Sequence, residues 1–148
     1  MDREYRAAEL FAEGYNCAQA VIMVFSDIIG MDEKQCAKLS SSFGGGMGRQ
    51  REVCGAVSGM LMVAGLLYGY DGPEEGQIKK EHYARVQQLC EQFRNEVGSI
   101  ICREILKNPP SDPNPTPRTA EFYQQRPCAH MVTLAVQIME QYISEHPV

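Results

Sequence analysis

Apolar residues recur at intervals of three and four along most of the chain, the spacing that places them on one face of an α-helix. Segments 2–13 and 16–29 follow this pattern, and segment 73–95 carries charged residues on its opposite side. Segment 52–69 is almost entirely apolar or glycine, so we expect a fully buried helix there. Further helices are predicted at 32–40, 99–107, 119–124 and 127–144. With no strand-like alternation, the pattern predicts an all-α, single-domain bundle of about six or seven helices spanning residues 1–148.

Two segments interrupt the helical pattern. Residues 44–48 include four glycines and predict a loop, and residues 108–118 hold five of the eight prolines. Proline lacks the N–H that a helix interior needs, so 108–118 is predicted to be a solvated connector. Residues 53–70 are eighteen residues without a charge, near the lower limit for a membrane span. Because they include four glycines and have polar flanks, we interpret them as a buried helix and expect no membrane insertion.

Composition narrows the class of function. The chain has 148 residues, and its net charge of −5 argues against a nucleic-acid partner, which would require a basic surface. The first residues are charged and helical, unlike a signal peptide, so a cytoplasmic location is expected. Thiols stay reduced in that compartment, so the six cysteines favour metal or redox chemistry over structural disulfides. A small bundle rich in apolar residues is also compatible with a homodimer.

Four of the six cysteines are predicted in the first turn of a helix, where unpaired N–H groups favour a thiolate or an anionic cluster. They follow a residue suited to begin a helix, such as Asn16 or Pro127, or a glycine-containing segment. These four are Cys17, Cys54, Cys102 and Cys128. The other two, Cys36 and Cys90, fall later within predicted helices and are interpreted as small core residues.

No two cysteines have the C-x-x-C spacing, which argues against thioredoxin-like, zinc-ribbon and common ferredoxin motifs. A shared site must therefore be assembled from separate helices, and the four sulfurs are predicted to lie in one pocket. Such a pocket could bind zinc or an iron–sulfur cluster, with all four cysteines as ligands, or could hold redox-active thiol pairs without a cofactor. Four inert, buried thiols are the remaining interpretation.

The residues around Cys54 are the most specific local signal. The glycine loop before it can turn successive N–H groups toward an anion, and its glycine-rich surroundings make Cys54 the favoured attacking thiol. The glycines considered for cofactor binding are Gly45, Gly46, Gly55 and Gly59. The arginines that could add positive charge near the cysteines are Arg49, Arg51 and Arg103. The alternatives are glycines that allow close helix packing and arginines that are solvated.

Four segments of the chain, in order, resemble the redox-active family named for the cysteine pattern C_GCAxxG_C_C. They read EGYNCAQAV from residue 13, CGAVSG from residue 54 with LLYG from residue 66, GSIICREIL from residue 98, and RPCAHMV from residue 126. The resemblance covers nearly the whole chain. It implies that the four family cysteines are Cys17, Cys54, Cys102 and Cys128, the same four that helix position selects.

The resemblance implies a bacterial or archaeal redox protein that passes electrons to or from a partner protein still to be identified, as an electron carrier or an oxidoreductase. The family description itself rests on the cysteines, so both a metal centre and thiol cycling stay open. A different class of function is a non-enzymatic helical module with a structural zinc site held by four cysteines, or with inert thiols.

Overall fold

The computed structural model describes residues 2–73 and 76–148. Within these residues the secondary structure is helical, apart from one isolated antiparallel bridge between Val53 and Ile101. The all-α prediction is therefore confirmed. The described residues contain more helices than the six or seven expected, because several are single short turns between longer helices.

The N-terminal third follows the predicted capping signals. It forms α1 (Arg3–Glu13), α2 (Cys17–Met23), α3 (Ser26–Ile29) and α4 (Glu33–Ser40). Asp2, Asn16 and Asp32 each accept a hydrogen bond from a backbone N–H in the first turn of the helix that follows. The predicted continuous helix 16–29 is wrong, since the chain bends at Val24 and Phe25. Arg3 donates a hydrogen bond to the Val24 carbonyl and lies over the Phe25 ring, which stabilises the bend.

The remaining helices begin later than the sequence suggests. After the short turns η1 (Ser41–Phe43) and α5 (Gly44–Met47) come α6 (Gly55–Tyr68), α7 (Gln77–Val97), α8 (Cys102–Leu106), α9 (Ala120–Gln125) and α10 (Cys128–Glu145). Helices α6 and α8 are shorter than predicted because Val53 and Ile101 pair with each other just before them. The predicted first turn of segment 73–95 includes residues 74–75, which lie outside the described residues.

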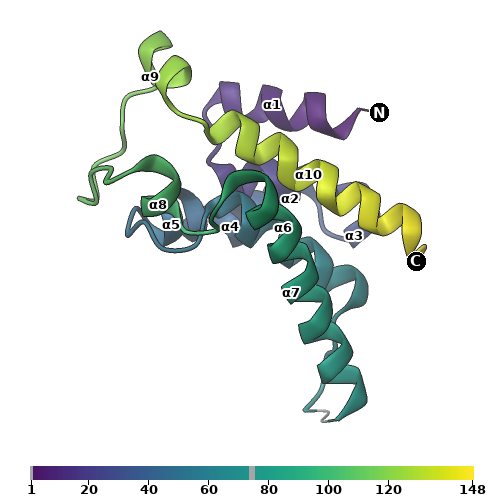
Figure 1. The fold of residues 1–148 in the computed structure, drawn as a ribbon. Coiled ribbons are helices and arrows are strands. Elements are labelled where there is room, and N and C mark those ends of the chain that lie inside the picture. The colour runs from purple at the N-terminus through teal and green to yellow at the C-terminus, as the bar shows by residue number, and fades with distance from the viewer. Residues whose placement is uncertain (1, 74–75) are drawn as a thin grey trace.

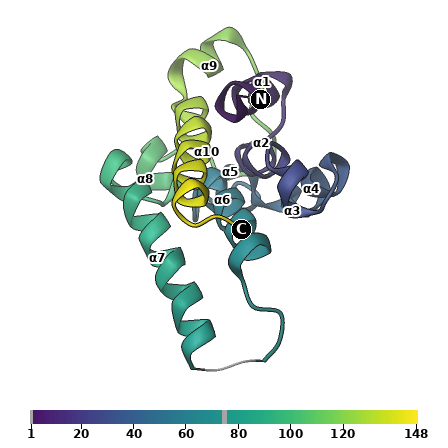
Figure 2. The ribbon, with the colours of Figure 1, turned by 90° about the vertical axis from the view of Figure 1, so that its right-hand side faces the viewer.

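The core lies where α2, α6 and α10 meet. Helices α1 and α10 lie side by side, and α7 projects beyond the body of the molecule (Figures 1 and 2). Large side chains from five helices or bends are fully buried, including Leu10, Phe25, Met60, Phe93 and Met139. The apolar helix α6 is buried along its first half, but Leu66 near its end is 47% exposed. In the described part of the chain, no helix is long and apolar enough to span a membrane.

Helices α2 and α6 are in close contact because Gly59 has no side chain. A Cβ atom at Gly59 would lie 2.7 Å from the Ala18 carbonyl oxygen and 3.0 Å from the Val21 Cβ. Gly65, two turns further along the same helix, is exposed and has no such neighbour within 4 Å. The contact matters for the site, because α2 also carries Cys17.

We predict opposite effects for the two matched substitutions Gly59→Ala and Gly65→Ala. Gly59→Ala should lower the free energy of unfolding by about 1–3 kcal/mol, because α2 and α6 must move apart. Gly65→Ala should raise it by up to about 1 kcal/mol, because alanine favours the helix. Urea denaturation followed by circular dichroism measures both. Equal effects of the two substitutions would contradict the packing role of Gly59.

Candidate functional site

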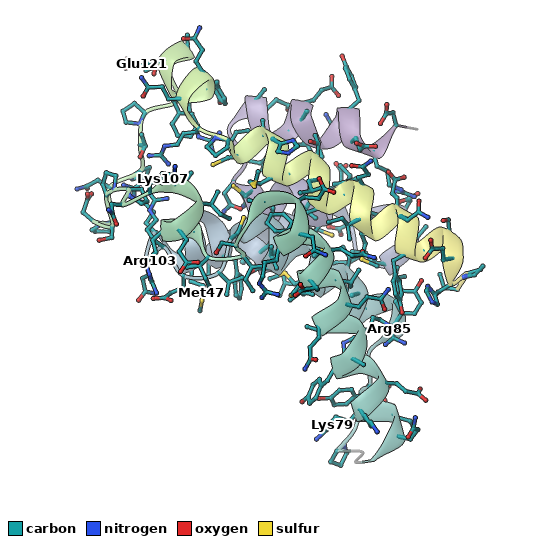
Figure 3. All side chains as sticks on the ribbon, viewed as in Figure 1. Met47, Lys79, Arg85, Arg103, Lys107 and Glu121 are labelled. Atoms are coloured by element: carbon teal, nitrogen blue, oxygen red, sulfur yellow. The ribbon has the colours of Figure 1, made fainter. Side chains whose placement is uncertain are left out.

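The four family cysteines converge on one small cavity of about 30 Å³, which we call the inner cavity. Cys17, Cys102 and Cys128 are the first residues of α2, α8 and α10, and Cys54 is the residue that caps α6. Figure 3 shows sulfur atoms gathered near the start of α10, above α8 and α5. The predicted convergence from four helix starts is confirmed.

The antiparallel bridge before α6 and α8 aligns the two inner cysteines. The Cys54 N–H donates to the Ile100 carbonyl at 2.7 Å, and the Cys102 N–H donates to the Glu52 carbonyl at 2.6 Å. These two backbone hydrogen bonds join chain segments almost fifty residues apart. They hold both cysteines against the inner cavity and leave their side chains 6% and 7% exposed.

The four glycines considered for cofactor binding have different neighbours in the structure. A Cβ atom at Gly46 would lie 2.7 Å from the Cys102 Cβ, and one at Gly55 would lie 3.2 Å from the Cys17 Cβ. Gly45 lines the inner cavity, and its φ of +65° favours glycine. Gly59 lies in the α2–α6 contact described above. Gly46 and Gly55 therefore allow the chain to approach Cys102 and Cys17 closely, Gly45 lines the cavity, and Gly59 acts in helix packing.

Two of the cysteines also face outward. Cys17 and Cys128 are partly exposed, and both line a second, more open pocket of about 310 Å³, which we call the outer pocket. Cys54 and Cys102 do not line it. Of the four family cysteines, only Cys17 and Cys128 therefore adjoin a molecule that enters the outer pocket.

The pKa of the Cys128 thiol is lowered to about 7. The largest cause is hydrogen bonding with the adjacent Cys17 thiol, and the positive charges of Arg126, Arg118 and Arg51 lower it further against the cost of burial. The same interaction raises the pKa of Cys17 well above its usual range, because Cys17 is the donor and lies beside a negative charge. Within this pair, Cys128 therefore loses its proton at lower pH than Cys17.

Burial disfavours the expectation that Cys54 is the attacking thiol. Burial raises the pKa of Cys54 to about 12, although the N–H groups of Ala56 and Val57 at the helix start favour its thiolate. Burial also raises the pKa of Cys102, despite the Arg51 Nη1 atom 3.7 Å from its sulfur. Loss of hydration therefore outweighs the helix N-terminus at the inner positions.

The proline-rich segment forms a wall of the outer pocket. Arg51 Nε donates to the Pro110 carbonyl at 2.9 Å, and Arg49 donates to the Asp112 carbonyl and to the Thr116 hydroxyl, both at 2.8 Å. The segment is largely exposed, as predicted, but these hydrogen bonds tie it to the residues that precede Cys54. The prediction of a solvated connector was therefore incomplete, because the segment also forms part of the outer pocket.

The arginines divide between site and surface. Arg49 and Arg51 line the outer pocket, but Arg103 forms an ion pair with Glu52 at 3.0 Å and points away from the site (Figure 3). Sequence reasoning missed Arg118 and Arg126, which also line the outer pocket. The position of Arg126 two residues before Cys128 was a usable signal, whereas nothing in the local sequence marked Arg118.

The two cysteines outside the family pattern lie in the core. Cys36 is fully buried and its sulfur donates to the Met31 carbonyl at 3.6 Å, and Cys90 is 8% exposed. Burial raises the pKa of both thiols. Neither lines the inner cavity or the outer pocket.

The four cysteines offer the donor atoms of a zinc or iron–sulfur site, but in the described residues they are not placed to hold a single metal ion. Among residues 2–73 and 76–148, no group of three or more histidine, cysteine or acidic side chains is placed to hold a metal ion. The Arg51 guanidinium instead interacts with one of the four sulfurs. We therefore derive no chemistry through a metal.

The fold and the site together define a helical protein in which four cysteines from separate helix starts line one cavity. The chain belongs to the C_GCAxxG_C_C family, described as "Putative redox-active protein (C_GCAxxG_C_C)", whose family model matches residues 15–142. Comparisons with curated proteins and with solved structures found no match.

We predict that Cys128 is the fastest thiol to react with iodoacetamide and that its rate rises with pH around a midpoint of about 7. An unperturbed cysteine would show a midpoint of about 8.5. Cys17→Ala removes the hydrogen-bond donor and should move the midpoint upward, whereas Cys17→Ser keeps a donor and should move it less. Alkylation that is quenched at set times and analysed by peptide mass spectrometry gives the rate at each cysteine. If the fast reaction persists in Cys128→Ser, another thiol is responsible for it.

Proposed function

We propose that this protein is a thiol–disulfide redox protein in which Cys128 attacks a disulfide substrate and Cys17 completes the exchange. The observation that carries the proposal is that these two cysteines line the same open pocket, where their interaction lowers the pKa of Cys128 and raises that of Cys17. Membership of a family described as redox-active supports the class of reaction.

The exchange takes two steps. The Cys128 thiolate attacks one sulfur of the substrate disulfide, whose S–S bond breaks, and the second substrate sulfur leaves as a thiolate. Cys17 then attacks the Cys128 sulfur of this mixed disulfide, and its proton passes to the departing thiolate. The protein gains one Cys17–Cys128 disulfide and loses two electrons, and the substrate is reduced to two thiols.

The electrostatics of the pair suit this order of events. Two of the largest causes that raise the pKa of Cys17 are its hydrogen bond to Cys128 and the negative charge there. Both end when the Cys128 sulfur enters a mixed disulfide, so the pKa of Cys17 falls at the step that requires its thiolate. Protonated, neutral Cys54 and Cys102 add no charge that would raise the pKa of Cys128.

The proposed cycle needs a reductant that converts the Cys17–Cys128 disulfide back to two thiols. A dithiol partner protein supplies two electrons and two protons in such an exchange. Its identity is not needed to test the first half of the cycle, because reduced protein reacts once with a small disulfide.

We predict that the reduced protein treated with 2-hydroxyethyl disulfide forms a Cys17–Cys128 disulfide and releases two thiols of mercaptoethanol per chain. Cys17→Ser should stop at a mixed disulfide on Cys128, because the second thiol is missing. Cys90→Ser is the matched control, since it removes a thiol outside the site and should react like the unchanged protein. Peptide mapping by mass spectrometry identifies each product.

The same preparation separates the proposal from a metal centre. Metal and sulfide content should be substoichiometric in active protein purified without oxygen. Stoichiometric iron with sulfide, or zinc whose removal unfolds the protein, would overturn the proposal, as would a disulfide between any other pair of cysteines.

A further inference from the structure

The outer pocket has a charge opposite to that of the chain as a whole. The protein carries a net charge of −5, yet four arginines line this one pocket and, among the described residues, no aspartate or glutamate does. They are Arg49, Arg51, Arg118 and Arg126. None of the four forms an ion pair within the described part of the chain, unlike Arg3, Arg6, Arg94 and Arg103.

One of these arginines is buried with unused hydrogen-bonding capacity. Arg51 is only 4% exposed; its Nε donates to Pro110 and its Nη1 to the Cys102 sulfur. Its Nη2 atom is buried and finds no acceptor among the residues that the structure describes. A buried guanidinium nitrogen without an acceptor is costly, and an anionic ligand in the adjoining pocket is a means of satisfying it.

Two further arginines are held in place by aromatic rings. The Arg118 guanidinium lies 4.5 Å from the Phe11 ring centre and donates to the Phe11 and Tyr15 carbonyls. The Arg126 guanidinium lies 5.2 Å from the Phe122 ring centre, and the described residues offer it no hydrogen-bond acceptor. Stacking fixes the planes of both guanidinium groups, and the N–H groups of Arg126 remain available for a carboxylate or phosphate.

The size and walls of the pocket restrict the ligand further. A volume of about 310 Å³ is at the small end of the range for ligand sites. The aromatic rings of Phe11 and Phe122 and the prolines of the 108–118 segment give it apolar walls between the arginines. The pocket therefore suits a small molecule with an anionic group and a short apolar chain.

We infer that the outer pocket selects small anionic disulfides, whose charged group binds the arginines while the disulfide reaches Cys128. This inference rests on the proposed thiol–disulfide function and adds to it the class of substrate. Cys17 and Cys128 line the same pocket as the arginines, so one ligand can contact both. The arginines then have two roles, since they bind the substrate and favour the Cys128 thiolate.

Three small disulfides of similar size and different charge test the inference. They are 3,3′-dithiodipropionate, which is anionic, 2-hydroxyethyl disulfide, which is neutral, and cystamine, which is cationic. The second-order rates should fall in that order, with the anion about tenfold or more faster than the neutral probe, as expected for hydrogen bonds to a charged group. The advantage of the anion should shrink as salt is added.

The ratio of anionic to cationic rates is the informative quantity. All three probes meet the same Cys128 thiolate, so a change in its pKa alters every rate equally and leaves the ratio unchanged. Arg126→Gln should therefore reduce the ratio several-fold. Arg94→Gln is the matched control, because it removes the same charge from an exposed ion pair on α7, outside the outer pocket, and should preserve the ratio.

A second pair of probes works even if no disulfide reacts. Iodoacetate and iodoacetamide both alkylate a thiolate, but only iodoacetate is anionic. Preference for iodoacetate at Cys128, reduced in Arg126→Gln, supports the anion pocket on its own. Reaction of all the disulfides without charge preference would overturn the inference and leave the proposed function intact. If Cys128 prefers iodoacetate but none of the disulfides reacts, the proposed function is overturned. The assignment of disulfides as the substrates is then overturned with it.

The anionic group itself is distinguished by competition. Succinate and inorganic phosphate are added separately to the reaction with the neutral disulfide. Inhibition by succinate assigns a carboxylate ligand, and inhibition by phosphate assigns a phosphate ligand; either result supports an anion site. No inhibition by either, in the unchanged protein at low salt, would contradict it.

Discussion

The site depends on the energetic cost of placing a negative charge among four closely spaced sulfur atoms. A buried thiolate loses hydration, and a second thiolate beside it would add repulsion, so only a position with compensating charge can ionise near neutral pH. Cys128 has that position because the Cys17 thiol and three arginines lie near it. Cys54 and Cys102 lie deeper, and burial keeps them protonated. Of the four family cysteines, only Cys128 therefore has a lowered pKa.

The backbone holds the inner and the outer cysteines in different positions. The bridge between Val53 and Ile101 holds the inner cysteines, while the starts of α2 and α10 place the outer two at the pocket. Gly46 and Gly55 allow the chain to pass within contact distance of Cys102 and Cys17, where any side chain would clash. Close packing and redox chemistry therefore make demands on the same short segments.

The proline-rich segment shows how an irregular stretch can contribute to a site. It has no helix to supply its backbone hydrogen bonds, so its carbonyl oxygens at Pro110 and Asp112 accept hydrogen bonds from Arg51 and Arg49. The same hydrogen bonds orient those two arginines toward the cysteines. Although this segment has no regular secondary structure, it fixes the positions of two of the arginines that define the pocket.

Much of this protein was determined by local sequence. Helical periodicity and capping residues such as Asn16 and Asp32 predicted the all-α fold and the starts of α1, α2 and α4, because both act over only a few residues. The position of four cysteines at helix starts, together with the family resemblance, also selected the residues that converge. These signals are local or motif-based, and they needed no knowledge of which helices pack together.

Tertiary structure alone decided which cysteine has a lowered pKa and which arginines contribute to lowering it. The pKa of a thiol depends on its depth and on charges brought from distant parts of the chain, such as Arg118 beside Cys128. The break at Val24 and the late start of α6 likewise depend on partners far away in sequence, Arg3 and Ile101. Sequence therefore determined the helices and the set of thiols, whereas long-range packing determined burial and electrostatics, and through them the chemistry.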